Sequence, residues 1–120
     1  MSSVILIVDD EKSIRDLVSS ILTRAGHQVT VAEDGEQALR FLEQHVPKLL
    51  LTDIVMPGMS GLALAAHAHH NRPELRVMFM SGFVSQYEEE LSGSVWLRKP
   101  FTPSQLLAAV EDVLALKRAE

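Results

Sequence analysis

The sequence predicts an α/β domain in which helices cover both faces of a five-stranded parallel sheet. Five short apolar segments alternate with segments whose apolar residues recur at helical spacing, and this alternation is typical of parallel strands joined by right-handed crossovers. The first and third segments are apolar at nearly every position, as in strands buried on both faces. The expected strands are 4–8, 28–32, 49–53, 76–80 and 94–97.

Local signals place the helices between these strands. Gly26 is suited to the position just after the end of the first helix. Asp34 precedes the second helix with Gln37 three residues later, and Thr102 precedes the last helix with Gln105 three residues later; this spacing is typical of helix N-caps. The expected buried face of the first helix comprises Ile14, Leu17, Val18, Ile21 and Leu22. The third helix is expected at 62–70, and a short fourth helix at 86–91.

Length and composition indicate one globular domain, residues 1–120. A hydrophobic content of 47% with 22% charged residues suits a single packed core. A net charge of −5 argues against direct binding of nucleic acid, and no apolar run is long enough to cross a bilayer. The absence of cysteine excludes disulfides and fits a reducing compartment. Acidic residues interrupt the first apolar run, unlike in a signal peptide. We therefore expect a cytoplasmic protein without membrane attachment.

Polar side chains follow four of the five expected strands at the point where each strand ends. They are Asp9 and Asp10, Asp53, Ser81 and Lys99. An aspartate at a single strand end is common in turns and needs no function. Because the carboxyl ends of parallel strands meet at one edge of the sheet, where such folds bind ligands, these five residues are expected to lie together.

This group of side chains suits metal-assisted phosphoryl transfer. Three neighbouring carboxylates raise one another's pKa unless a cation lies among them. With neither histidine nor cysteine in the group, a hard cation that prefers oxygen is indicated, and Mg²⁺ is favoured. Asp53 could attack a phosphoryl group while the metal and Lys99 neutralise its oxygens and Ser81 donates a hydrogen bond.

The chain resembles the receiver domain of two-component response regulators over essentially its whole length. The resemblance rests on Asp9-Asp10, on the segment 53–61 (DIVMPGMSG), on Ser81 and on Lys99-Pro100-Phe101, in that order and spacing. It implies a doubly wound (βα)5 fold of flavodoxin-like strand order 2-1-3-4-5, as in single-domain chemotaxis regulators.

The resemblance also implies roles for individual residues. Asp53 would accept a phosphoryl group from the phosphohistidine of a kinase. Asp10, Asp53 and the backbone carbonyl of Val55 would bind Mg²⁺ directly, and Asp9 would act mostly through water. Ser81 and Lys99 would hold phosphoryl oxygens.

Three features near the C-terminal strand bear on the switch that the resemblance implies. Ser81 and Trp96 would be its two side chains, and Trp96 is larger than the Tyr or Phe usual there. The segment from Ser81 to Lys99 is about four residues shorter than the family pattern, roughly one helical turn, so the fourth helix is expected to be shortened. Family members often have a cis Lys-Pro bond, whereas the low frequency of cis bonds favours trans for Lys99-Pro100.

The implied function is a phosphoacceptor switch, which is not an enzyme in the usual sense. Its implied partners are a sensor histidine kinase or phosphotransfer protein and an unidentified downstream protein, with the chain itself a monomer or weak homodimer. One alternative is a receiver-like interaction module that is never phosphorylated. The other is a small aspartyl-phosphate phosphatase of the haloacid dehalogenase type, which requires a second Asp where this chain has Val55.

Overall fold

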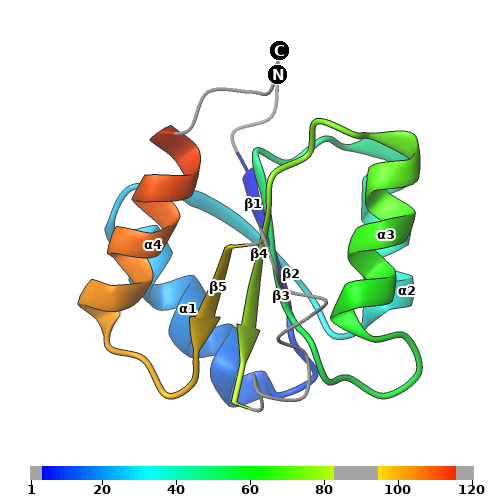
Figure 1. Ribbon diagram of the computed structural model, residues 1–120. Helices are drawn as coiled ribbons and strands as arrows, with labels where there is room; N and C mark the ends of the chain where they lie inside the picture. The colour runs from blue at the N-terminus through cyan, green and yellow to red at the C-terminus, as the bar shows by residue number, and fades with distance from the viewer. Residues whose placement is uncertain (1–3, 83–94, 116–120) are drawn as a thin grey trace.

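The strands and helices alternate along the chain as the sequence predicts (Figure 1). The computed structural model describes residues 4–82 and 95–115. The predicted fourth helix at 86–91 lies outside these residues, so α4 denotes the helix after β5. Within the described residues no helix has the length and apolar character needed to span a membrane. The elements are β1 Val4–Val8, α1 Lys12–Arg24, β2 Gln28–Ala32, α2 Gly35–Gln44, β3 Leu49–Asp53, α3 Gly61–Asn71, β4 Val77–Ser81, β5 Val95–Arg98 and α4 Pro103–Ala115.

The five strands form one parallel sheet in the order β2-β1-β3-β4-β5, which confirms the predicted topology. Figure 1 shows α1 and α4 on one face of the sheet and α2 and α3 on the other. Strand β3 is central and buried at all its positions. A strand covered on both faces is mostly apolar, which explains the three leucines that precede Thr52 and Asp53.

Alternate residues of the central strands enter two separate cores. Ile5 and Ile7 of β1 pack in the core that also contains residues of α1 and α4. Leu6 and Val8 pack in the core that contains residues of α2 and α3. Each fully buried side chain of this size contributes about 1.5–3 kcal/mol. The two cores therefore hold the ends of β1 and β3 firmly in place.

Side-chain caps begin two of the helices as predicted. The Asp34 carboxylate accepts a hydrogen bond of 2.9 Å from the backbone N–H of Gln37 at the start of α2. At the start of α4, the Thr102 hydroxyl accepts from the Gln105 N–H at 3.1 Å, and the Gln105 amide oxygen accepts from the Thr102 N–H at 2.9 Å. This reciprocal pair is a capping box.

Three details differ from the sequence predictions. β4 and β5 each end one residue later, because the ladder between them continues to the pair Ser81 and Arg98, and β4 also begins one residue later. Leu17, expected on the buried face of α1, is 46% exposed because it lies at the border of the apolar stripe. The Lys99-Pro100 bond is cis, contrary to the expectation from frequency.

The loop between β3 and α3 turns back onto the end of β3. Gly58 has a φ of +78°, a left-handed conformation that glycine adopts without steric cost. The backbone N–H of Gly61 donates to the carbonyl of Ile54 at 2.8 Å. A Cβ added at Gly61 would overlap the backbone carbonyl of Asp53. The first residue of α3 is therefore pressed against the peptide group that follows Asp53.

The substitution Gly61→Ala should destabilise the fold, because the added methyl group meets backbone rather than a movable side chain. We expect the free energy of unfolding in urea to fall by about 1–3 kcal/mol, as for other overpacked sites. Gly82→Ala is the matched control, since a Cβ there has nothing within 4 Å. Equal stability of the two variants would show that the approach of Gly61 to Asp53 is not close.

Candidate functional site

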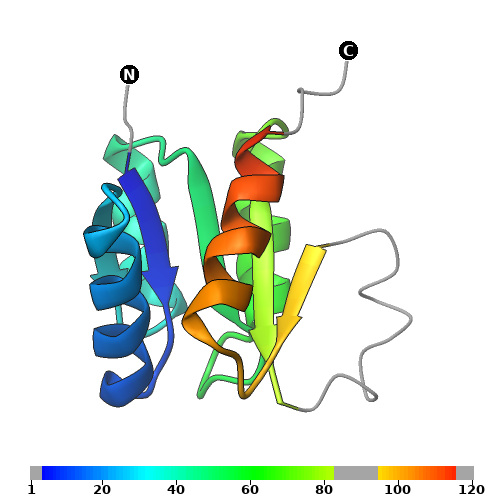
Figure 2. The same ribbon diagram turned by 90° about the vertical axis from the view of Figure 1, so that its left-hand side faces the viewer.

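The predicted polar residues lie at the carboxyl ends of the strands. Figure 2 shows the arrowheads of β1, β4 and β5 at the same end of the molecule. Asp9 follows β1, Asp53 ends β3, Ser81 ends β4 and Lys99 follows β5. Asp9, Asp53 and Ser81 are at most 6% exposed although they are polar. Burying a polar group costs free energy unless the group is hydrogen-bonded or paired with an opposite charge. We therefore expect these three side chains to have polar partners.

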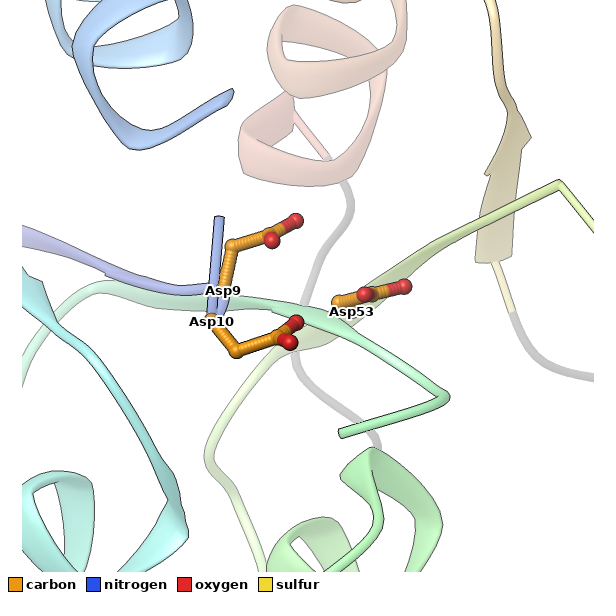
Figure 3. A group of neighbouring side chains, drawn as sticks. All are labelled: Asp9, Asp10 and Asp53. Atoms are coloured by element: carbon orange, nitrogen blue, oxygen red, sulfur yellow. The ribbon is translucent and has the colours of Figure 1, made fainter. Parts of the chain in front are cut away.

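Three of these side chains form an acidic cluster. One carboxylate oxygen from each of Asp9, Asp10 and Asp53 lies within 4.8 Å of the other two. Figure 3 shows Asp9 and Asp10 extending from the end of β1 toward the side where Asp53 lies. Asp9 is completely buried and Asp10 is exposed. The cluster thus combines two buried carboxylates, Asp9 and Asp53, with the exposed carboxylate of Asp10.

Asp9 is held by four hydrogen bonds. Its Oδ1 accepts from the backbone N–H of Glu11 and its Oδ2 accepts from Lys99 Nζ, each at 2.9 Å. Its backbone N–H donates to the carbonyl of Ala32 at 3.3 Å, and its own carbonyl accepts from the Arg15 guanidinium at 2.8 Å. These bonds fix the Asp9 carboxylate in place at the end of β1 and orient it toward Lys99.

Asp53 uses its two carboxylate oxygens differently. Oδ1 accepts a hydrogen bond of 2.9 Å from the backbone N–H of Ile54. Oδ2 lies 3.4 Å from Lys99 Nζ. Lys99 therefore bridges Asp9 and Asp53, the carboxylates at the ends of β1 and β3.

Burial dominates the electrostatics of Asp53. Burial raises the pKa of this carboxyl from 3.8 to about 6. The positive charge of Lys99 lowers the pKa, and the negative charge of Asp9 raises it, but both effects are smaller than that of burial. Burial lowers the pKa of Lys99, but the hydrogen bond to Asp9 and the nearby carboxylates outweigh it and raise the pKa above 10.5. Near neutral pH, Lys99 is charged and Asp53 is mostly ionised, ready to act as a nucleophile.

The donor set fits a hard divalent cation. Within the described part of the chain, Lys99 is the one ammonium in direct contact with these three carboxylates, which leaves an excess of two negative charges among them. Oxygen donors of this kind are the ligands that Mg²⁺ prefers. Asp10, being exposed, and Asp53 are the carboxylates best placed to bind it. Val55, whose carbonyl was the third predicted ligand, lies in the exposed part of the loop after β3.

The two predicted switch residues lie at different distances from the cluster. Ser81 is buried beside it, and its carbonyl accepts from the backbone N–H of Lys99 at 2.9 Å. Trp96 is 39% exposed on the edge strand β5, opposite Phe79 and two residues before the pair of Ser81 with Arg98. Ser81 is thus joined through its backbone to Lys99, whereas Trp96 is partly exposed on the edge strand.

Two contacts of the site were not predicted from the sequence. Arg15 binds the carbonyl of Asp9, and the Thr52 hydroxyl donates to the carbonyl of Asp53 at 2.9 Å. The position of Arg15 could have indicated its contact. A cation in the first turn of a helix is disfavoured by the helix dipole unless a negatively charged group lies nearby, which suggests that Arg15 interacts with the acidic site. The hydroxyl of Thr52 between three leucines and Asp53 was a weaker signal.

Comparison with known proteins gives a consistent result. The family model described as response regulator receiver domain matches residues 5–111. The response regulator receiver protein CpdR of Brucella abortus is 34% identical over 92% of this chain and 95% of its own length. Sporulation initiation phosphotransferase F of Bacillus subtilis is 32% identical over 98% of both chains. Other relatives are longer: the chain spans 49% of the transcriptional regulatory protein PhoP of Bacillus subtilis.

Solved structures agree in fold. The receiver domain of NtrX from Brucella abortus superposes with a TM-score of 0.87 at 34% identity, covering 94% of this chain and 99% of that one. The response regulator TrrA of Thermotoga maritima, solved in complex with Mg²⁺ and BeF, gives 0.84 at 31% identity, with coverages of 94% and 99%. From the family match, the relatives and the shared fold, the chain belongs to the family of response regulator receiver domains.

Proposed function

We propose that Asp53 accepts a phosphoryl group from the phosphohistidine of a sensor kinase or phosphotransfer protein in a Mg²⁺-dependent reaction, and that phosphorylation changes a partner-binding surface. One observation carries this proposal. Asp53 is a buried carboxylate with one oxygen held by a backbone N–H and the other facing an ammonium, beside two further carboxylates.

Each residue of the site has a separate role in the proposed phosphoryl transfer. Asp53 Oδ2 attacks phosphorus, the new P–O bond forms as the P–N bond of the donor breaks, and the electron pair of that bond returns to the donor imidazole. Lys99 neutralises charge on the phosphoryl oxygens, and Asp9 holds Lys99 in position. Preorganised charges of this kind are the main source of catalysis in phosphoryl transfer. Ser81 supplies a further donor to the phosphoryl group.

The proposed metal ligands are Asp10, Asp53 and the backbone carbonyl of Val55, with Asp9 acting through water. When bound, Mg²⁺ would neutralise phosphoryl oxygens and relieve the repulsion among the carboxylates. The excess negative charge of the cluster supports this assignment, as does the similarity to TrrA, whose solved complex includes Mg²⁺ and BeF.

In this proposal the chain is a switch that promotes its own phosphorylation and hydrolysis, as a cytoplasmic monomer or weak homodimer. The proposal does not identify the downstream partner. An interaction module that is never phosphorylated would have no need for a buried carboxylate with a raised pKa beside two others. A phosphatase of the haloacid dehalogenase type would need a carboxylate at the exposed position that Val55 occupies.

Incubation with acetyl phosphate and Mg²⁺ should add one phosphoryl group to the wild-type chain, detected by intact mass. Asp53→Ala should abolish the addition because the attacking oxygen is lost. Asp112→Ala, which removes an exposed aspartate of α4, should be labelled like the wild type. Equal labelling of Asp53→Ala would exclude Asp53 as the acceptor. An unlabelled wild type would favour the interaction module, and steady turnover of a phosphate ester would favour the phosphatase.

We also propose that Ser81 and Trp96 form the switch. A phosphoryl group on Asp53 would attract the Ser81 hydroxyl, since charge-assisted hydrogen bonds are about twice as strong as neutral ones. Movement of this end of β4 would open space toward β5, where the indole now lies 39% exposed. An indole that becomes buried needs a hydrogen-bond partner for its N–H. Burial of the Trp96 ring is therefore less favourable than burial of a Phe ring at the same position would be.

The fluorescence of Trp96, the only tryptophan in the chain, should report this change. Beryllofluoride with Mg²⁺ should alter its emission and reduce quenching by a soluble quencher, because the ring leaves solvent. Ser81→Ala should bind the same mimic, as seen in its melting temperature, but show a smaller change in emission. If the mimic stabilises the wild type while emission and quenching stay fixed, Trp96 is not the switch.

A further inference from the structure

The buried hydroxyl of Thr52 is a polar group that the proposed mechanism does not use. Thr52 follows three leucines in β3, is completely buried and directly precedes Asp53. A buried hydroxyl is unfavourable unless it is hydrogen-bonded. Its hydrogen bond goes to the backbone carbonyl of Asp53, at 2.9 Å. A valine would have the same shape and would suit the buried strand better. Packing alone therefore does not explain why this position carries a hydroxyl.

The carbonyl that Thr52 binds belongs to the same peptide group as the N–H that binds the Asp53 side chain. That peptide group joins Asp53 to Ile54, and its N–H donates to Asp53 Oδ1 at 2.9 Å and to the carbonyl of Met80 at 3.2 Å. A peptide group is planar, so a bond that orients its carbonyl also orients its N–H. Hydrogen bonds in a chain also polarise one another, which makes the N–H a stronger donor.

The consequence is a distinction between the two oxygens of Asp53. Oδ1 is held by the Ile54 N–H, whereas Oδ2 faces Lys99 Nζ at 3.4 Å. Gly61 presses against the same carbonyl from α3 and limits where it can lie, and the Thr52 hydroxyl gives this carbonyl a directional hydrogen bond. The orientation of this one peptide group decides which oxygen is occupied.

We propose that Thr52 is a positioning residue for phosphoryl transfer. Acting through the peptide group between Asp53 and Ile54, it keeps Oδ1 occupied and presents Oδ2 as the attacking atom. This role rests on the proposed function, because it concerns the oxygen that accepts the phosphoryl group. The alternative is that Thr52 only fills space in β3.

Two substitutions at this position separate the hydroxyl from the volume of the side chain. Thr52→Val keeps the shape and removes the donor, whereas Thr52→Ser keeps the donor and removes a methyl group. Thr30→Val is the matched control, because it makes the same change in β2. Melting curves without Mg²⁺ establish that each variant is folded.

The first readout is the amide proton resonance of Ile54 in Mg²⁺-free protein, measured by NMR. Loss of the Thr52 hydroxyl should weaken the bond to Oδ1 and shift this resonance upfield in Thr52→Val. Thr52→Ser and Thr30→Val should leave it near the wild-type position. The second readout is the rate of labelling by acetyl phosphate with Mg²⁺. Its maximum should fall by about 2- to 10-fold in Thr52→Val, the effect expected of one hydrogen bond, with little change in the half-saturating concentration.

Rescue by serine decides between the two roles. If Thr52→Ser retains the wild-type rate and Ile54 resonance while Thr52→Val loses both, the positioning role is supported. If Thr52→Val matches the wild type in both readouts, or if serine is as slow as valine, the role is overturned. If wild-type Asp53 is not labelled at all, the proposed function fails, and the Ile54 resonance still decides whether Thr52 holds Oδ1.

Discussion

The contact of one ammonium with two buried carboxylates is the constraint on which the site depends. Lys99 Nζ lies 2.9 Å from Asp9 and 3.4 Å from Asp53, and so joins the ends of β1, β3 and β5. Asp10 adds a third carboxylate, and residues 4–82 and 95–115 supply no second ammonium in direct contact with the cluster. The ends of these strands are fixed by the two cores, so the charges cannot separate to relieve their repulsion.

Burial of Asp53 makes the site costly to the fold, although Lys99 reduces this cost. Because folding raises the pKa of Asp53 from 3.8 to about 6, the native state binds more protons than the unfolded state between these values. The contribution of Asp53 to stability therefore falls as the pH rises through this window. At neutral pH the ionised carboxylate therefore weakens the metal-free fold. A divalent cation or a bound phosphoryl group changes that charge balance, which is how a local event can influence the surrounding strands.

Much of this arrangement could be predicted from the sequence, because the strands, the helix caps and the strand-end residues are each specified within a short segment of the chain. The leucine run ending at Asp53 specifies a buried strand, and polar residues at successive strand ends specify the edge where they meet. The capping pairs at Asp34 and Thr102 also follow from spacing alone. The unpredicted details depend on tertiary contacts: the exposure of Leu17, the added residue at the end of β4, and the peptide group that links Thr52 to Asp53 Oδ1. Sequence spacing carries no information on which oxygen of a carboxylate is occupied.

Three carboxylates facing one ammonium give the acidic cluster an excess of negative charge, and Mg²⁺ is the cation proposed to bind there. The most direct test is the melting temperature of the unphosphorylated chain as Mg²⁺ is added. Mg²⁺ should raise it for the wild type, since a ligand that binds only the folded state stabilises that state, and Asp112→Ala should respond equally. Asp10→Ala should lose the response, because it removes the exposed carboxylate of the cluster. An unchanged wild type, or an equal rise in Asp10→Ala, would contradict the account.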